Sequence, residues 1–209
     1  MKIILNVSNL FLGGGVQVAI SFLYELKFIK KKYKYFVFLS NPISEQIEQY
    51  IFPKNFKFYK ITKPISSLKT RLLVIKKLNK LEAEIMPDIV FTLFGPSYWK
   101  PKAKNLVGFA DPWLLNPTSV AYKQLSYFHR IRRRLLNFYK EYYLKKESKN
   151  FIIETNDGKN KLSRYLKIPN NRIFVVNNSI SHVFDDKKFL SKKNNFYIKL
   201  PKKRKMNLD

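Results

Sequence analysis

The amino-terminal stretch constrains the fold more than any other part of this sequence. Residues 3–7 form a short apolar run rich in β-branched side chains, which is long enough for a buried strand and too short for a helix. Gly13, Gly14 and Gly15 then interrupt the pattern. Apolar residues recur at helical spacing over residues 16–29, which predicts an amphipathic helix. The chain therefore opens with a strand, a glycine turn and a helix.

The glycine turn has two interpretations. Backbone amides at the start of a helix have no partners within that helix, and Gly13, Gly14 and Gly15 would let a phosphate approach them without meeting a Cβ atom. Alternatively, the turn only connects the strand to the helix. The spacing of the glycines does not match the dinucleotide-binding fingerprint, and no Lys-Ser/Thr pair follows them as in a P-loop.

Strand and helix patterns alternate along the rest of the chain. Short apolar runs bounded by turn residues indicate strands at 34–40, 56–61, 88–93, 105–109, 151–154 and 172–176. Helical spacing indicates helices at 44–51, 68–85, 122–146 and 159–166. Ser66 or Ser67 is expected to cap the second of these helices, and the strand at 56–61 is expected near an edge of the sheet. The alternation predicts an α/β fold, with a mostly parallel, wound sheet and helices on both faces.

The long helix expected at residues 122–146 combines apolar and basic side chains. The apolar positions recur at helical spacing and are Leu125, Phe128, Ile131, Leu135, Phe138 and Tyr142. Arginines and lysines occupy most of the other positions. We favour an apolar stripe that faces the core, with a solvated basic back. The alternative is a surface that binds an anionic membrane.

The composition narrows the classes of partner and site. The chain carries 41 Lys and Arg residues against 14 Asp and Glu residues, a net charge of +27 that would suit a polyanion. The excess is mostly Lys and is spread along the chain, so codon bias is another explanation, and we expect lipid head groups before nucleic acid. With no cysteine and with two histidines far apart, neither a disulfide framework nor a metal site is expected.

No targeting segment or membrane span is expected from the sequence. Asn6, Ser8 and Asn9 interrupt the apolar start of the chain, and no small-residue cleavage site follows, so the start does not match a signal peptide. No apolar run is long enough to cross a bilayer. These features favour a cytoplasmic protein, either soluble or attached to the inner face of the cytoplasmic membrane.

Ligands of open parallel sheets bind at the carboxyl ends of the strands, where the loops meet. Here the loops at residues 94–102 and 110–119 supply a carboxylate, a hydroxyl and aromatic rings, which suit the recognition of a sugar. The candidate residues are Gly95, Ser97, Tyr98, Asp111 and Trp113. In the alternative interpretation, the tryptophans fill the core beneath the loops and Asp111 caps a turn.

The order of these features resembles the N-terminal domain of GT-B glycosyltransferases of family 4. The residues that carry the resemblance are Gly13-Gly14-Gly15-Val16-Gln17, Pro87-Asp88-Ile89-Val90, the segment from Val107 to Trp113 and the segment from Arg172 to Ile180. The last segment is similar to the family's element before the crossover to the second domain, with Asn178 at the asparagine position. The resemblance covers most of residues 1–184.

The resemblance implies a Rossmann-like domain that forms one half of a two-domain enzyme. Such an enzyme transfers a sugar from a nucleotide-sugar to a saccharide or lipid-linked acceptor in the synthesis of a cell-surface polysaccharide, without a metal or cofactor. The glycine turn would face the donor diphosphate, and the aromatic and basic surfaces would receive the acceptor. The implied substrate-binding residues are Gly13, Gly14, Gly15, Gln17, Gly95, Ser97, Tyr98, Trp113 and Asn178.

Two departures from the family pattern matter. Many relatives carry a His immediately before the Asp of the loop after the fifth strand, whereas this chain has Ala110, so Asp111 is the remaining catalytic candidate. The half that binds the nucleotide-sugar is expected to be missing. Residues 1–184 are interpreted as one domain, and residues 185–209 as a basic linker and the start of a truncated second domain, with a strand at 196–200. On this interpretation the chain is inactive alone.

Two further interpretations stay open from the sequence. The chain is either a basic binding module for nucleic acid or an anionic membrane, or one subunit of an enzyme that another chain completes. A basic module would bind with an affinity that falls steeply with salt.

Overall fold

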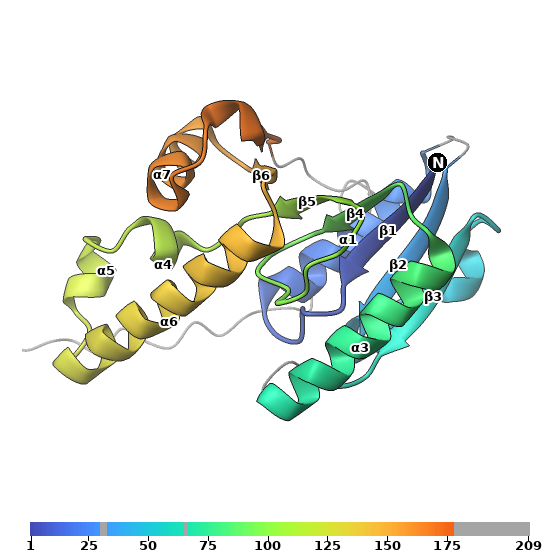
Figure 1. Cartoon of the computed structure of the whole chain (residues 1–209), viewed down its shortest axis with the longest axis horizontal. Helices are drawn as coiled ribbons and strands as arrows, with labels where there is room; N and C mark the ends of the chain where they lie inside the picture. The colour runs from blue at the N-terminus through green and yellow to red at the C-terminus, as the bar shows by residue number, and fades with distance from the viewer. Residues whose placement is uncertain (30–32, 65–66, 178–209) are drawn as a thin grey trace, which may run out of the picture. The chain divides into compact units, whose positions relative to one another are not determined.

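A computed structural model describes residues 1–29, 33–64 and 67–177, and within them seven parallel strands form one sheet. The strands are β1 (Lys2–Val7), β2 (Lys34–Ser40), β3 (Phe56–Ile61), β4 (Ile89–Thr92), β5 (Lys104–Gly108), β6 (Phe151–Ile153) and β7 (Ile173–Val175). Their order across the sheet is β3-β2-β1-β4-β5-β6-β7. The chain therefore adds strands on one side of β1 and then on the other, which confirms the expected wound parallel sheet and the Rossmann-like α/β class (Figure 1).

Helices flank this sheet, and Figure 1 shows α1 behind the strands and α3 in front of them. The helices are α1 (Gly14–Leu26), α2 (Asn41–Gln46), α3 (Leu68–Ile85), α4 (Pro112–Leu115), α5 (Val120–Lys123), α6 (Tyr127–Glu147) and α7 (Asn156–Leu166). Short 3-10 turns, η1 (Gln49–Ile51) and η2 (Asn170–Arg172), precede β3 and β7.

Buried apolar side chains hold the helices to the two faces of the sheet. Successive residues of a strand point to opposite faces, and in β1 Leu5 packs with α1 whereas Ile4 packs with α3. Leu23 of α1 and Leu78 of α3 are fully buried in these two clusters. A third cluster joins α4, α6 and α7 to β5, β6 and β7. Both faces of the sheet are therefore covered, as the alternating pattern predicts.

The connection from β4 to β5 is unusual for this fold, because residues 93–103 contain no helix. Trp99 lies in this connection and packs against α3 and β2. Its side chain is buried in the α3 cluster, its ring centroid lies 6.0 Å from that of Phe38, and its indole Nε1 donates a hydrogen bond of 2.8 Å to Asn79. This tryptophan therefore fills the core beneath a loop, as the alternative interpretation proposed.

Local capping explains where several helices begin and end. Ser67 accepts a hydrogen bond from the amide of Thr70, and the Thr70 hydroxyl accepts one from the amide of Ser67, a reciprocal pair that fixes the start of α3. Met86 ends α3 in the left-handed conformation, one residue before Pro87. Thr155 caps α7 through the amide of Gly158. Of the two serines considered for the α3 cap, Ser67 is the one the structure describes.

Two expectations about the elements need adjustment, and a third is confirmed. The helix expected at 44–51 begins earlier, at Asn41, because Pro42 is well suited to the first turn of a helix, and it ends at Gln46. The helix expected at 159–166 begins at Asn156 because Thr155 caps it. The expectation of an edge position for β3 is confirmed.

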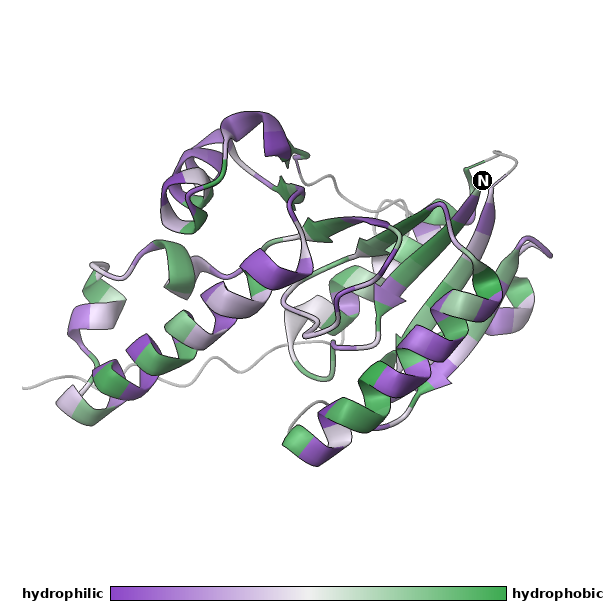
Figure 2. Ribbon diagram, viewed as in Figure 1, coloured by the Kyte–Doolittle hydropathy of each residue, from purple (hydrophilic) through white to green (hydrophobic). Residues whose placement is uncertain are grey.

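The long basic helix differs most from the expectation. The helix is interrupted at residues 124–126, so that α5 and α6 are separate helices. The apolar stripe of α6 does not face the core: Phe128 is 80%, Leu135 67% and Phe138 73% exposed. A helix of 21 residues extends about 30 Å, whereas the neighbouring strand β6 has only 3 residues and spans about 10 Å, so the sheet covers only its end. Figure 2 shows apolar and polar residues alternating along α6.

The remaining expectations concern residues outside the described part of the chain. They are the Asn178 site, the boundary after residue 184, the basic linker at 185–209 and the strand at 196–200. Among the residues that the structure does describe, none of the helices combines the length and the apolar character needed to cross a membrane.

Candidate functional site

The order of the strands directs attention to one edge of the sheet. β1 and β4 are neighbours, but the chain leaves β1 toward β2 and leaves β4 toward β5. Loops that follow two such strands diverge and leave a crevice at their carboxyl ends, which is where ligands of wound α/β sheets bind. The loops after β1, β4, β5 and β6 lie side by side at this edge, which we call the carboxyl rim.

The glycine turn after β1 is open at the carboxyl rim. Gly13 has φ +74°, a left-handed value that favours glycine, and it precedes the first residue of α1. A Cβ atom built on Gly13 or Gly14 would meet no heavy atom within 4 Å, whereas one on Gly15 would lie 3.5 Å from Leu10. The amides at the start of α1 are therefore approachable from solvent. The glycine turn therefore has room for an anion, and anion binding there stays a prediction.

Gln17 lies one turn into α1 and is exposed. Its side-chain amide donates a hydrogen bond of 3.2 Å to Gln46 of α2. This position places Gln17 beside the glycine turn and close to the carboxyl end of β2.

A buried polar network fixes the loop after β1 to the loop after β4. The side chain of Asn6 donates to Thr92 of β4 at 3.3 Å and accepts from the hydroxyl of Ser8 at 2.7 Å. Asn9 donates 2.7 Å to the carbonyl of Phe94 and 3.3 Å to that of Pro96. Because these groups are paired at the crevice itself, they hold the glycine turn at a fixed place relative to residues 94–96.

The candidates in the loop after β4 do not form an open site. Gly95 is close-packed, since a Cβ atom there would lie 2.5 Å from Val107 and 3.2 Å from Leu144. Ser97 is fully buried, and its hydroxyl and amide both donate to the carboxyl group of Glu147 on α6, the amide at 2.8 Å. These two residues therefore attach the loop to the body of the protein, and no ligand reaches the Ser97 hydroxyl in this conformation.

Tyr98 turns away from the carboxyl rim. Its backbone has φ +60°, and its ring packs against Tyr139 and Tyr143 of α6, with centroid distances of 5.7 and 5.0 Å. The Arg71 guanidinium lies 5.3 Å from the centroid of the Tyr98 ring. Burial, assisted by the neighbouring Tyr139, raises the pKa of Tyr98 above its ordinary value. Tyr98 belongs to the layer between α3 and α6.

Asp111 lies at the carboxyl rim, and its carboxylate accepts hydrogen bonds from two backbone amides and forms an ion pair with a lysine. It caps α4, with one carboxylate oxygen accepting from the amides of Trp113 at 3.1 Å and Leu114 at 3.3 Å. The other oxygen accepts from Lys140 of α6 at 2.5 Å, in an ion pair whose side chains are about one-fifth exposed. A carboxylate has about four lone-pair positions, so these three contacts leave about one for a ligand hydroxyl.

A cavity of about 260 Å³ adjoins Asp111 at the carboxyl rim. Its walls come from the ends of β5 and β6 and the first turns of α4 and α7, and the polar side chains among them are Asp111, Asn116, Glu154, Thr155, Asp157 and Lys161. Lys161 donates 2.9 Å to Asn116 and pairs with Asp157 at 2.8 Å. The cavity thus presents alternating donors and acceptors, an arrangement that suits a polyhydroxylated ligand.

Trp113 lies beside this cavity and lines a second depression of about 340 Å³ with Asn116 and Ser119. Its ring centroid is 6.3 Å from that of Tyr122, and the Arg133 guanidinium lies 4.8 Å from it. One face of the indole is therefore occupied by a cation, which stabilises the ring in place.

The structure divides the predicted site into two groups. The glycine turn, Gln17, Asp111 and Trp113 lie at the carboxyl rim, whereas Ser97 and Tyr98 are bound to α6 and α3. Sequence analysis missed Lys140 and Lys161, which pair with carboxylates at the rim. No local signal distinguishes these lysines from the many others, because their partners are set by tertiary packing. Among the described residues, no cluster of His, Cys, Asp or Glu suits a metal ion.

Comparison with known proteins shows similarity at the level of the fold. No protein-family model and no curated protein matches this sequence. The structure is similar to a glycosyltransferase from Rickettsia africae ESF-5, with a TM-score of 0.51 and 15% identity, over 90% of this chain and 45% of that one. UDP-GlcNAc 2-epimerases from Methanocaldococcus jannaschii and Neisseria meningitidis align with a TM-score of 0.49 and 16% identity each, over 84% and 92% of this chain and 44% and 53% of theirs.

The chain spans about half the length of the solved structures that it matches. At 15% identity, the likeness to the Rickettsia africae protein shows the fold alone. The described residues form an α/β domain that resembles one half of a GT-B enzyme.

Proposed function

We propose that this chain is the acceptor-side half of a GT-B sugar transferase, which moves a sugar from a nucleotide-sugar to a saccharide or lipid-linked acceptor. One arrangement supports the proposal most: the open glycine turn and the cavity beside Asp111 lie on the same edge of the sheet, at strands β1 and β5, which β4 alone separates. A transferase needs two neighbouring sites, one for an anionic donor and one for a hydroxylated acceptor.

The glycine turn is assigned to the donor diphosphate. The first amides of α1 and its dipole favour an anion, and Gly14 leaves room for it. Asp111 and Lys140 are assigned to the acceptor. The free lone pair of Asp111 accepts a hydrogen bond from an acceptor hydroxyl, which orients the oxygen of that hydroxyl, and the ion pair with Lys140 keeps the carboxylate in position. The nucleotide itself would bind to the second half of the GT-B fold.

Titration of the ¹⁵N-labelled chain with pyrophosphate tests the donor assignment. Amide shifts are expected at Gly14 and Gly15, and Gly14→Val is expected to abolish them with the fold intact, since a Cβ atom there meets no heavy atom within 4 Å. Leu12→Ala, at an exposed position before the turn, is the matched control and is expected to keep the shifts. Shifts confined to surface lysines, or binding that survives Gly14→Val, would contradict the assignment.

Saccharide binding tests the acceptor assignment. In ligand-observed NMR, hexoses and oligosaccharides are expected to bind the chain weakly, and Asp111→Asn is expected to weaken that binding about tenfold. Asp157→Asn changes a carboxylate in the same cavity whose side chain is 71% exposed, and it is expected to have a smaller effect. The comparison of binding requires that the two variants have the same thermal stability. An equal loss in both would show that the cavity attracts sugars without a specific role for Asp111.

A second candidate function is attachment to an anionic membrane through α6. The observation that favours it is the exposure of the apolar residues of α6 among four arginines, a combination typical of helices that lie in a membrane interface. The arginines are Arg130, Arg132, Arg133 and Arg134. Such attachment would bring the carboxyl rim close to a lipid-linked acceptor, so this candidate is compatible with the first.

Vesicle flotation tests the membrane candidate. The chain is expected to float with vesicles that contain phosphatidylglycerol and less with pure phosphatidylcholine. A Leu135→Ser/Phe138→Ser double variant removes exposed apolar side chains without touching a charge, and it is expected to reduce flotation at unchanged net charge. If flotation decreases with salt concentration but is the same for this variant and the parent, simple attraction by the net charge of +27 explains the flotation.

A further inference from the structure

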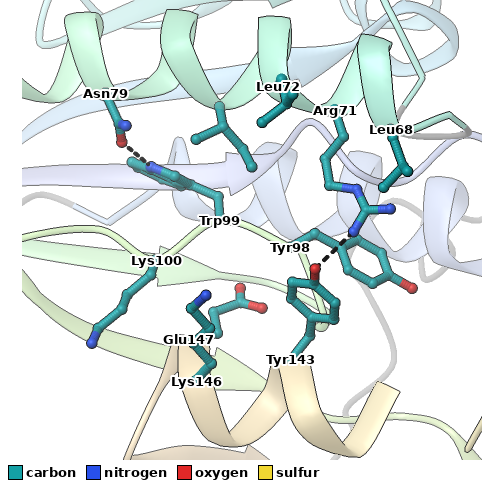
Figure 3. A pocket seen from close by; sticks show the side chains of 11 residues that line it. Leu68, Arg71, Leu72, Asn79, Tyr98, Trp99, Lys100, Tyr143, Lys146 and Glu147 are labelled. Atoms are coloured by element: carbon teal, nitrogen blue, oxygen red, sulfur yellow. Dashed lines mark hydrogen bonds between the residues drawn. The ribbon is translucent and has the colours of Figure 1, made fainter. Parts of the chain in front are cut away.

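One cavity away from the carboxyl rim has no role in the transferase proposal. It has a volume of about 420 Å³ and lies between α3, the loop after β4 and the last turns of α6 (Figure 3). This volume is within the range of cavities that hold small molecules. None of its lining residues belongs to the cavity at the carboxyl rim, so an inference drawn from it does not depend on the proposed function.

One part of this cavity is apolar and open. Leu68 and Leu72 project from one side of α3, and the Tyr98 and Tyr143 rings lie across the cavity from that helix. Ile75 of α3 also lines the cavity. Leu68 and Leu72 are 72% and 69% exposed, although leucines on a helix are usually covered. Removal of these two leucines from water would therefore be favourable. An apolar ligand segment that lies between the leucines and the tyrosine rings would provide that burial.

The other part of the cavity is cationic. Lys100 enters from the loop and Lys146 from α6, and Figure 3 shows Lys100 and Leu68 at opposite ends of the view. Arg71 contributes a third positive charge, held against the Tyr98 and Tyr143 rings and bonded to the Tyr143 hydroxyl at 3.0 Å. Both lysines are exposed, and the Lys146 ammonium group lies 5.7 Å from the centroid of the Tyr142 ring, a contact that it would exchange for one with a ligand.

One carboxyl group, Glu147, also lines the cavity, and its oxygens are directed to the loop. They accept hydrogen bonds from the amide and hydroxyl of Ser97. With three cations against one carboxyl group that is paired inside the protein, the cavity attracts anions.

We infer that this cavity binds an amphiphile with a single apolar chain and an anionic head group. The apolar chain lies between Leu72, Ile75 and the tyrosine rings, and the head group lies at Lys100 and Lys146. An alkyl phosphate and a fatty carboxylate share this chemistry. Neither a free anion nor an uncharged detergent satisfies both parts of the cavity.

Trp99 provides a direct signal for binding. Its buried side chain lines the cavity and hydrogen-bonds to Asn79, so a ligand in the cavity should change its fluorescence. The sequence has two tryptophans, and Trp113→Phe leaves Trp99 as the only one. We therefore propose to titrate the full chain carrying Trp113→Phe with decyl phosphate, decanoate, decyl maltoside and inorganic phosphate, each below its critical micelle concentration where it has one.

Decyl phosphate, decanoate or both are expected to bind in a saturable manner, and the tighter of the two identifies the head group. Inorganic phosphate and decyl maltoside are expected to bind at least about tenfold more weakly. Equal binding of decyl maltoside would overturn the inference, because it would show an apolar site without charge selection. Binding of inorganic phosphate as tight as that of decyl phosphate would also overturn the inference, because it would show an anion site to which the apolar chain contributes nothing.

Matched variants locate the site. Leu72→Asp and the Lys100→Glu/Lys146→Glu double variant are each expected to weaken binding about tenfold or more. Leu73→Asp changes the next residue of α3, which is exposed and does not line the cavity, and Lys149→Glu changes an exposed lysine just after α6. Both controls are expected to stay within about twofold of the parent. If Leu72→Asp and Leu73→Asp weaken binding equally, the ligand does not occupy this cavity and the inference is wrong.

Discussion

At the scale of single residues, Glu147 links the stability of the protein to pH. Its side chain is buried at the end of α6, and burial raises the pKa of its carboxyl group from 4.5 to about 7, although hydrogen bonds from Ser97 and Tyr98 counteract part of the shift. The folded state therefore holds a proton that the unfolded state releases at a lower pH. A buried group with a raised pKa stabilises the fold in acid and loses that contribution as pH rises.

We expect the contribution of Glu147 to be fully present below about pH 4.5 and to be lost by about pH 7, a change of about 3 kcal/mol at most in the free energy of unfolding. Glu147→Gln keeps a neutral side chain at every pH, so the difference in stability between variant and parent should grow in favour of the variant from pH 5 to pH 7. Urea unfolding at a series of pH values measures it. Glu84→Gln, at an exposed position of α3, should show no such trend.

Gly95 offers a second test at this scale, because it was predicted to bind substrate and the structure gives it a packing role. A Cβ atom there would meet Val107 and Leu144, so we expect Gly95→Ala to lower the free energy of unfolding by about 1–3 kcal/mol. Gly14→Ala, where a Cβ atom meets nothing within 4 Å, is the control and should change stability little. Equal stability of the two variants would contradict the packing described here.

At the scale of elements, the reciprocal Ser67–Thr70 pair determines how firmly α3 begins. Ser67→Ala removes the cap and leaves the amide of Thr70 without its partner, so we expect a loss of about 1 kcal/mol in the free energy of unfolding. Thermal melting measures the loss. Ser67→Asp retains an acceptor at the cap and should restore most of it, whereas an equal loss in both variants would show that the cap contributes nothing.

Most elements were predictable because each depends on a local pattern. The strand, glycine turn and helix of residues 2–26 follow from apolar periodicity, and the ends of α3 follow from Ser67 and Pro87. The stripe of α6 was misjudged because periodicity shows which side chains share a face but not whether anything covers that face. Whether the stripe is covered depends on the length of β5 and β6. These strands are too short to reach most of α6, so Phe138 is exposed to solvent.

The candidate site was less predictable than the fold. Pattern reasoning placed Asp111 and the glycine turn correctly at the ends of strands, since parallel strands share a carboxyl edge. It grouped Ser97 and Tyr98 with them, because it could not anticipate that Glu147, fifty residues later, would bind the loop from α6. Contacts between residues so distant in sequence depend on the packed structure and leave no trace in local spacing.

At the scale of the whole molecule, the sheet should open from its edges. β1, β2 and β4 pair on both sides and lie between α1 and α3, whereas β7 pairs only with β6. We expect hydrogen exchange to be slowest at the amides of β1, β2 and β4 and fastest, among the strands, at β7. Mass spectrometry or NMR exchange measures this order. Uniform protection across the seven strands would indicate that the sheet unfolds in one step.

The connection between β4 and β5 contains no helix and is held to the rest of the protein by individual side chains. An ordinary helix attaches to a sheet through many side chains along its length, whereas this segment is held at separate points. Trp99 packs beneath it, Ser97 bonds to Glu147, Asn9 bonds to its first carbonyls, and Glu82 accepts from its last two amides. If the contacts of Trp99 and Ser97 were lost, this loop would come away from α3 and from the end of α6, whereas β4 would stay paired with β5.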